Sequence, residues 1–384
     1  MSSETEITNA RVYLLVHDLA APRGVSCAWA STRESVLVKL TDAAGLSGWG
    51  EAALRPGVVA ALQELSSMTV GRQPQDARAL ADLVSSTAAD RWAISALSIA
   101  IDDLRGRQLG ASVAGLYGGG RRERVRAYAA SGGYEKDVGP EETWPREIDE
   151  VIESGFTAYK FRIGRFSPQR EMPILERIRE RVPSNFDLLA DGNGAYGLPR
   201  AIEVGRVLER LGFRWLEEPV VRHDAALTDA LDIAIAGGEG LETRNAFADY
   251  LGRGAADIVQ PDVAICGGIG EALFVAELGA LAGRSCAPHC WGGAIVIAAT
   301  LQLHALLPDA SRVPDMDSPL MEYDIFENPM RTKLLREPLV MTDGCFSIPS
   351  SPGLGIEVDE QFVERMDVLK GPNPARRSYG FTFS

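Results

Sequence analysis

The stretch Asp191-Gly192-Asn193 decides the fold, together with two similar stretches that follow it, Leu216-Glu217-Glu218-Pro219 and Gly237-Gly238-Glu239. In each stretch an acid follows a short apolar or β-prone run, and the acids are 26 and 22 residues apart. This spacing is about one βα unit, so it predicts consecutive parallel strands with acids at their carboxyl ends. Three converging carboxylates suit a divalent cation such as Mg²⁺. The alternative is that each acid caps a helix or faces solvent, but three acids in register favour the metal.

Strand-like and helix-like segments alternate about eight times between residues 121 and 327. This alternation predicts an α/β fold with a (β/α)₈ TIM-type barrel as the catalytic domain. A doubly wound open sheet is the alternative, but no predicted strand is followed by a G-x-G-x-x-G turn, so dinucleotide binding has no support. The predicted strands are residues 125–130, 158–163, 186–191, 213–217, 232–238, 257–260, 284–288 and 320–322, and predicted helices include 170–181, 198–211, 243–251, 270–282 and 294–306.

The region before the barrel has a different pattern. Residues 1–120 begin with strands at 7–18 and 35–40, continue with a largely helical stretch at 57–116, and end at a glycine- and arginine-rich junction. They predict an α+β capping domain. Residues 20–30 contain Pro, Arg and Gly and are expected to form a mobile loop.

The alternation of strands and helices stops after residue 327. A hairpin-like segment at 339–348 and a turn at 352–356 follow. Because these last strands have no barrel partner left, we expect residues 328–384 to return to the capping domain and complete it.

Composition limits the classes of function. The chain has 384 residues, 46% of them hydrophobic, and a formal net charge of −14, which argues against nucleic acid and anionic membranes as partners. Five cysteines are too sparse for a disulfide framework and favour a reducing, cytoplasmic location. The N-terminus does not resemble a signal peptide, and no run of about 18 apolar residues could span a membrane.

Two cations end the second predicted barrel strand. Lys160 and Arg162 are two residues apart, so strand alternation places them on the same side. In a plain core two inward cations would be costly, and they could instead extend outward or pair with structural acids. Beside three carboxylates and a metal, they have a reason to point inward.

The sixth and seventh strands end in Asp262 and His289. Neighbouring strand ends can bring the carboxylate to the imidazole, where it fixes the tautomer and raises the basicity of the ring. A lone His is more often structural, but its position at a strand end beside Asp262 favours an acid/base dyad. Glu322, near the last strand end, is either a partner of a developing enolate oxygen or a solvated loop acid.

With these residues placed, the chain resembles the enolase superfamily, and within it the mandelate racemase subgroup. The resemblance covers nearly the whole chain, and the set of motifs is specific although each one alone is weak. It is carried by the K-x-R, D-x-N, E-E-P, G-G-E, Q-P-D, P-H and P-G-L-G-I segments and by Ala100-Ile101-Asp102-Asp103-Leu104-Arg105-Gly106 before the barrel. Residue by residue, the resemblance implies that Asp191, Glu217 and Glu239 bind Mg²⁺, that Lys160 and Arg162 occupy the K-x-K positions, that Asp262 and His289 form the dyad, and that Glu322 hydrogen-bonds the enolate.

The resemblance also implies a chemical step, abstraction of a proton α to a carboxylate to give an enediolate. This chain departs from the racemases of the subgroup at Arg162, where they have a second lysine as one of two opposed bases. A guanidinium stays protonated at ordinary pH and is a poor base. His289 alone can remove the α-proton and then protonate a departing β-hydroxyl, which is a syn dehydration.

We therefore predict a Mg²⁺-dependent lyase that dehydrates an acid sugar to a 2-keto-3-deoxy acid. The alternatives are a lactone-opening cycloisomerase, suggested by a likeness of residues 288–293 and 219–221 to galactarolactone cycloisomerases, a racemase or epimerase, and a barrel that binds without catalysis. The predicted substrate is a small carboxylate, contacted by Asn193, Arg23 and Trp291. Loops at 20–30 and 51–54 are implied to close over the site, and the resemblance implies a homo-oligomer.

Overall fold

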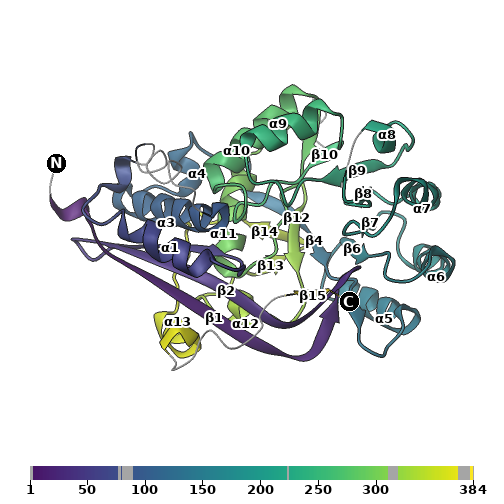
Figure 1. The fold of residues 1–384 in the computed structure, drawn as a ribbon, viewed down its shortest axis with the longest axis horizontal. Helices are drawn as coiled ribbons and strands as arrows, with labels where there is room; N and C mark the ends of the chain where they lie inside the picture. Colours follow the sequence, from purple (N-terminus) through teal and green to yellow (C-terminus); the bar gives the residue numbers. More distant parts are fainter. Residues whose placement is uncertain are drawn as a thin grey trace.

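The N-terminal part is an antiparallel sheet covered by helices on one face (Figure 1). The computed structural model describes residues 3–76, 79, 90–222, 225–309, 319–370 and 381–383. Long strands β1 (Ile7–Gly24) and β2 (Ala28–Asp42) pair along their lengths, and β3 (Ser47–Ala52) pairs with β2. Helices α1 (Val58–Ser67) and α3 (Arg91–Leu109) bury their apolar residues against this sheet.

Close approach of β3 to α3 depends on glycine. A Cβ on Gly50 would lie 1.8 Å from the carbonyl oxygen of Ala96, and one on Gly48 would lie 2.3 Å from that of Ala100. No other residue fits there, so the alternation of Gly48 and Gly50 is a packing signal.

The central part contains the eight parallel strands of a ten-stranded sheet, with a helix after most of them (Figure 1). All eight predicted barrel strands are present. They are β4 (Arg124–Ala130), β6 (Ala158–Arg162), β7 (Asp187–Asp191), β8 (Trp215–Glu217), β9 (Ala234–Gly237), β10 (Ile258–Val259), β11 (Ser285–Cys286) and β12 (Met321–Asp324). The helices are α5 (Pro140–Glu153), α6 (Pro168–Arg181), α7 (Leu198–Arg210), α8 (Ala225–Thr228), α9 (Arg244–Gly252), α10 (Ile269–Leu281) and α11 (Ala294–Leu306).

The parallel strands follow one another in chain order across the sheet, from β4 to β11, with β12 on the other side of β4. Within the described residues no ladder joins β11 to β12. The backbone N–H of Cys290, just after β11, nevertheless donates to Glu322 of β12 at 3.0 Å. The two ends of the sheet therefore come within hydrogen-bonding distance of each other.

The expectation of a mobile loop at 20–30 is wrong for most of that range. The β1–β2 ladder is interrupted after Asp18 and resumes at Arg23, which pairs with Ala30. Gly24 also pairs with Tyr134 of the short strand β5 (Tyr134–Glu135). These ladders hold residues up to 24 as strand, so the connection between β1 and β2 is reduced to residues 25–27.

The expectation that the 339–348 hairpin returns to the capping domain is also wrong. Strand β14 (Cys345–Ser347), paired with β13 (Met341–Thr342), forms an antiparallel ladder with the start of β4. Strands β6 and β12 pair with β4 only from Ala127 onward, so residues 124–126 have backbone groups available for the hairpin.

Later C-terminal residues do reach the N-terminal part. Gly353 accepts from Val113 N–H in α4 (Val113–Leu116), and Leu354 N–H donates to Asp103 of α3 at 2.8 Å. Helix α13 (Glu360–Met366) lies against β1, and β15 (Phe381–Phe383) pairs with β2 (Figure 1). In the part of the chain that the structure describes, no helix has the length and apolarity needed to cross a membrane.

Candidate active site

Three acids at the ends of consecutive strands converge as predicted. Asp191 ends β7, Glu217 ends β8, and Glu239 follows β9 by two residues. Each offers a carboxylate oxygen that lies within 4.8 Å of the other two. Because parallel strands bring their carboxyl ends to one edge, the βα spacing is enough to assemble the cluster.

The cluster has the properties of a cation site. Burial raises the pKa of Asp191 to about 7 against the opposing effect of Arg162, and burial raises the pKa of Glu239 to about 7 against that of His289. One carboxylate oxygen of Glu239, Oε2, is buried and has no hydrogen-bond partner among the described residues. Crowded carboxylates with an unused buried oxygen fit a hard divalent cation that supplies the missing positive charge.

Lys160 and Arg162 point inward, so an outward orientation is excluded. Nζ of Lys160 lies 2.6 Å from Glu217 Oε1 and 2.7 Å from Glu322 Oε1, and Arg162 forms an ion pair with Asp191. Burial alone would lower the pKa of Lys160, but Glu217 and Glu322 outweigh it and raise that pKa. Burial would also raise the pKa of Glu217, but Lys160 and Arg162 hold it at about 2. Both cations are therefore charged members of the acidic cluster.

Asp262 and His289 are in contact, as predicted. Nδ1 of His289 lies 2.6 Å from Asp262 Oδ2, while Nε2 lies 3.4 Å from Glu239 Oε2 and 3.9 Å from Glu322 Oε2. Burial alone would lower the pKa of His289, but Glu239, Glu322 and Asp262 raise it to about 10. One ring nitrogen is thus held by Asp262, and the other faces the acidic cluster.

Glu217 has two further partners to which the sequence reasoning gave no role. Gln260 Nε2 donates to Glu217 Oε2 at 2.9 Å, and Trp215 Nε1 donates to the same oxygen at 3.2 Å. Trp215 lies in strand β8, and Gln260 directly follows β10, so both lie at the edge of the sheet where the acids are. This position was the signal that could have revealed them. The predicted substrate residue Asn193 donates from its backbone and its side-chain amide to Asp191, at 2.7 and 3.1 Å.

A cavity of about 360 Å³ lies between the carboxyl ends of the parallel strands and the N-terminal sheet. From the side of the parallel sheet it is lined by His289, Arg162, Glu239 and Asp262. Side chains from the N-terminal part close the other side; among them are Cys27, Arg33, Glu51, Leu54 and Trp92. Predicted substrate residues Asn193 and Trp291 line the cavity as well.

The third predicted substrate residue, Arg23, is not part of the cavity lining. It forms an ion pair with Glu135, and its guanidinium lies 5.5 Å from the ring centroid of Phe326. Because β1 continues through residue 24, Arg23 is held on the sheet and does not belong to a loop over the site.

Glu51 connects the N-terminal sheet to helix α11. Its buried carboxylate accepts from Gly293 N–H at 2.7 Å and Val296 N–H at 3.1 Å, at the start of α11, and from the Ser35 hydroxyl at 2.6 Å. A Cβ on Gly293 would lie 2.5 Å from Glu51 Oε1, so glycine is required there. This acid therefore caps the helix that follows His289 and Trp291.

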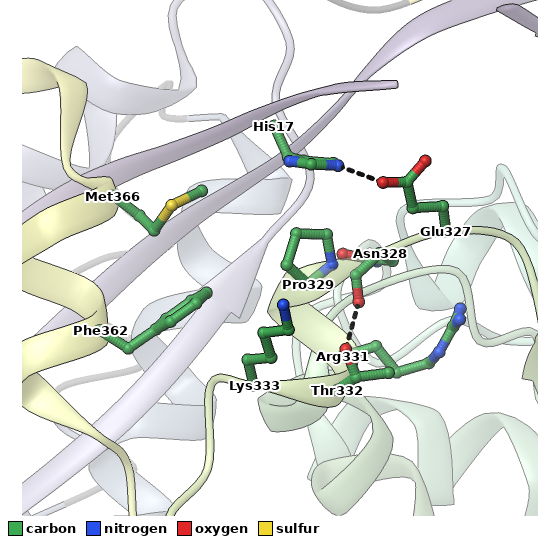
Figure 2. Close-up of a pocket in the computed structure, with 9 residues that line it drawn as sticks. All are labelled: His17, Glu327, Asn328, Pro329, Arg331, Thr332, Lys333, Phe362 and Met366. Atoms are coloured by element: carbon green, nitrogen blue, oxygen red, sulfur yellow. Dashed lines mark hydrogen bonds and ion pairs between the residues drawn. The ribbon is translucent and has the colours of Figure 1, made fainter. Parts of the chain in front are cut away.

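A second cavity, of about 340 Å³, lies between β1, α13 and α12 (Pro329–Thr332) (Figure 2). It contains none of the predicted catalytic or metal-binding residues, and Asn328 is the residue that it shares with the first cavity within the described chain. Its lining residues are His17, Glu327, Asn328, Pro329, Arg331, Thr332, Lys333, Phe362 and Met366.

Known proteins resemble this chain along nearly its whole length. Residues 144–362 match the family described as enolase C-terminal domain-like, and residues 8–118 match the mandelate racemase / muconate lactonizing enzyme N-terminal domain. D-galactarolactone cycloisomerase of Agrobacterium fabrum is 35% identical over 96% of this chain and 100% of its own. Arabinonate dehydratase of Saccharolobus solfataricus is 31% identical over 71% of each chain.

Solved structures share the fold. The 3,6-anhydro-D-galactonate cycloisomerase of Zobellia galactanivorans has a TM-score of 0.83 and 27% identity, over 94% of this chain and 99% of its own. A variant of L-talarate/galactarate dehydratase bound to Mg and L-glucarate has a TM-score of 0.83 and 25% identity, over 94% of this chain and 92% of its own. Together with the family matches, these likenesses show that the chain belongs to the mandelate racemase / muconate lactonizing enzyme family, within the enolase superfamily of enzymes.

Proposed function

We propose that the protein is a Mg²⁺-dependent acid-sugar dehydratase, which removes the proton α to a carboxylate and expels the β-hydroxyl to give a 2-keto-3-deoxy acid. The observation that carries this proposal is that His289 and Arg162 both line one cavity. The imidazole can exchange a proton at Nε2, whereas the guanidinium is a permanent cation. A single group that can exchange protons suits an elimination better than a racemisation, because racemisation needs a base on each face of the carbanion.

Asp191, Glu217 and Glu239 are the residues that would hold the Mg²⁺. When bound, the metal supplies Lewis-acid stabilisation of negative charge on the substrate carboxylate. The ammonium of Lys160, fixed by Glu217 and Glu322, adds positive charge beside the same group. Glu322, which is fully buried, is a structural partner of Lys160 and a candidate hydrogen-bond partner of the substrate.

His289 would carry both proton transfers. Nε2 accepts the α-proton when the ring is neutral; a cation bound beside Glu239 would favour that state, because Glu239 is the main charge that raises the pKa of His289. Asp262 keeps Nδ1 protonated and the ring oriented. The electron pair of the broken C–H bond forms a C=C bond, and the C–O bond to the β-hydroxyl breaks. His289 returns the proton to this hydroxyl, water departs, and the resulting enol becomes the 2-keto acid.

Opening of a lactone is the second candidate, favoured by the 35% identity to a galactarolactone cycloisomerase. The proton abstraction is the same, but the group expelled from the β-carbon is the ring carboxylate. This leaving group needs no proton, so His289 would then act on the first step only.

A screen of acid sugars and their lactones with Mg²⁺ separates the candidates. Dehydration predicts one 2-keto acid and one water for each acid sugar consumed, whereas lactone opening predicts consumption of the lactone and no reaction of the open acid. Absence of both reactions, with no α-proton exchange in D₂O for any compound, would contradict the proposal.

We further propose that the eight parallel strands close into a barrel between β11 and β12, which the contact of Cys290 with Glu322 supports. The capping-domain limits at 1–120 and 328–384, the homo-oligomer and the cytoplasmic location stay predictions. So does the absence of a nucleic-acid partner. Size-exclusion chromatography with light scattering would test the oligomer.

A further inference from the structure

We propose that Arg33, on the capping strand β2, binds a second carboxylate of the substrate, so that the enzyme prefers dicarboxylic acid sugars. The inference rests on the proposed function and deepens it, because it names the class of acid sugar. Its basis is the position of Arg33 in the cavity, its buried Nε, which has no acceptor among the described residues, and its partly offset charge.

Arg33 faces the same cavity as the catalytic groups but belongs to the other wall. It lines the cavity together with Arg162 and His289. The Trp291 ring is contacted by both cations, with the Arg33 guanidinium 4.3 Å and the Arg162 guanidinium 5.3 Å from its centroid. Arg33 and Arg162 therefore lie next to the same Trp291 ring, on the wall of one cavity.

The guanidinium of Arg33 is buried with few partners. Its side chain is 7% exposed, and Nη2 donates to Asp324 at 2.7 Å. Nε is buried and has no acceptor within the described chain. A guanidinium has five N–H donors, and burial of unused charged donors is unfavourable. An acceptor that enters the cavity would therefore be stabilised here.

Neighbouring acids offset the buried charge of Arg33 only in part: burial lowers its pKa, and Asp324 and Glu34 do not raise it back to its ordinary value. Asp324 is shared with a second guanidinium, that of Arg331, whose Nη1 lies 3.1 Å away. Two buried cations therefore share one buried carboxylate. Glu34 also lines the cavity; its carboxylate accepts a hydrogen bond from the Thr32 hydroxyl, and its negative charge acts on Arg33 from a distance. A substrate carboxylate would supply the missing negative charge and could bind Arg33 through two hydrogen bonds.

Both candidate reactions involve a second carboxylate, remote from the one at the metal cluster, that Arg33 could bind. In an aldarate, one carboxylate lies at the metal cluster and the other at the far end of the chain, whereas an aldonate ends there in a neutral CH₂OH group. In the lactone reaction, the departing ring oxygen becomes part of a new carboxylate remote from the metal. Arg33 would stabilise that developing charge in the same way.

Arg33→Gln and Arg331→Gln form a matched pair of variants. Each removes one cation from Asp324, but Arg331 lines the second cavity and does not line the first (Figure 2). Steady-state kinetics would compare galactarate with galactonate. Loss of a charged hydrogen bond of about 1.5–3 kcal/mol predicts a 10- to 100-fold fall in the diacid-to-monoacid ratio of kcat/KM for Arg33→Gln, mainly through KM. We expect the ratio to stay within about threefold for Arg331→Gln.

Two further measurements keep the test decisive. If Arg33→Gln does not fold, Arg33→Lys replaces it in the test. This variant retains the charge and should keep part of the preference for diacids. Thermal stabilisation of the Mg²⁺-loaded protein by adipate, relative to hexanoate, should be lost in Arg33→Gln and reduced in Arg33→Lys. Equal losses for both acids, or an equal shift of the ratio in Arg331→Gln, would overturn the inference. Failure of α-proton exchange with every acid sugar would instead refute the proposed function.

Discussion

Nδ1 of His289 lies 2.6 Å from Oδ2 of Asp262, and the other oxygen of that carboxylate accepts from Ala264 N–H at 2.7 Å. The backbone thus fixes the carboxylate, and the carboxylate fixes the ring. Nε2 is left facing the acidic cluster, 3.4 Å from Glu239. Asp262, which follows β10, therefore sets the orientation of the nitrogen that transfers the proton.

Replacement of His289 by Asn is expected to abolish turnover. The amide cannot exchange a proton in the required range, so we expect kcat to fall by about 10²- to 10⁴-fold or more. Mg²⁺ affinity, measured by calorimetry, should change little because the predicted ligands remain. Turnover retained at the wild-type level would remove His289 from the mechanism. Asp262→Asn is the graded control and should cost about 10- to 100-fold in kcat, since Asp262 acts through the imidazole.

Arg162 predicts the absence of racemisation. A substrate with an α-proton but no β-leaving group should exchange that proton in D₂O without inversion of the α-carbon, because the guanidinium does not act as a base. Proton NMR measures the exchange, and chiral chromatography measures the configuration. Efficient formation of the inverted product would overturn the assignment as a lyase.

Removal of the metal is expected to abolish activity and lower stability. Chelation should stop turnover, and Mg²⁺ should restore it and raise Tm; at 100 times Kd the stabilisation is about 2.7 kcal/mol. Glu239→Gln should weaken Mg²⁺ binding with little effect on the fold, because Glu239 Oε2 has no hydrogen-bond partner among the described residues. Glu217→Gln should in addition destabilise the fold, because it leaves Lys160 with less negative charge. An unchanged Tm with Mg²⁺ would contradict the predicted ligands.

Asp102, in α3, gives a prediction for the dependence of stability on pH. Burial raises its pKa to about 6, and the Tyr117 hydroxyl donates to it at 2.8 Å. A folded-state pKa above the unfolded value near 3.8 means that the contribution of this group is most favourable below pH 4 and is lost as the pH rises through 6.

Asp102→Asn removes this loss and keeps an acceptor for Tyr117. The stability of the variant relative to the wild type should rise between pH 4 and pH 7, by on the order of 2–3 kcal/mol at most. Urea unfolding at several pH values measures it. A difference independent of pH would show that burial of the charge has no such cost.

The acidic cluster and the dyad could be predicted because they depend on strand order alone. Parallel strands in chain order place Asp191, Glu217, Asp262 and His289 at one edge, and the positions of these residues at strand ends are visible in the sequence. The expected barrel strands followed from the same alternation of β-prone and helical segments.

Other features depend on contacts that no local pattern records. Cys345 pairs with Arg126, more than two hundred residues earlier, because the start of β4 is not covered by its parallel neighbours. Arg23 remains in a strand because Gly24 has a partner in Tyr134. Glu51 lies in a segment expected to close over the site, but its role as the cap of α11 depends on how the two parts of the chain meet.

The hydrogen bonds from Gly293 and Val296 to Glu51 have a consequence for engineering. A chimaera that joins the first 120 residues of another family member to the rest of this chain would lose the acceptor at the start of α11 unless its third strand also carried a suitably placed carboxylate. Helix α11 would then begin with unpaired N–H groups, and the Trp291 ring, which lines the cavity, would shift. Exchange of residues 1–120 between family members thus requires that the carboxylate of Glu51 be kept.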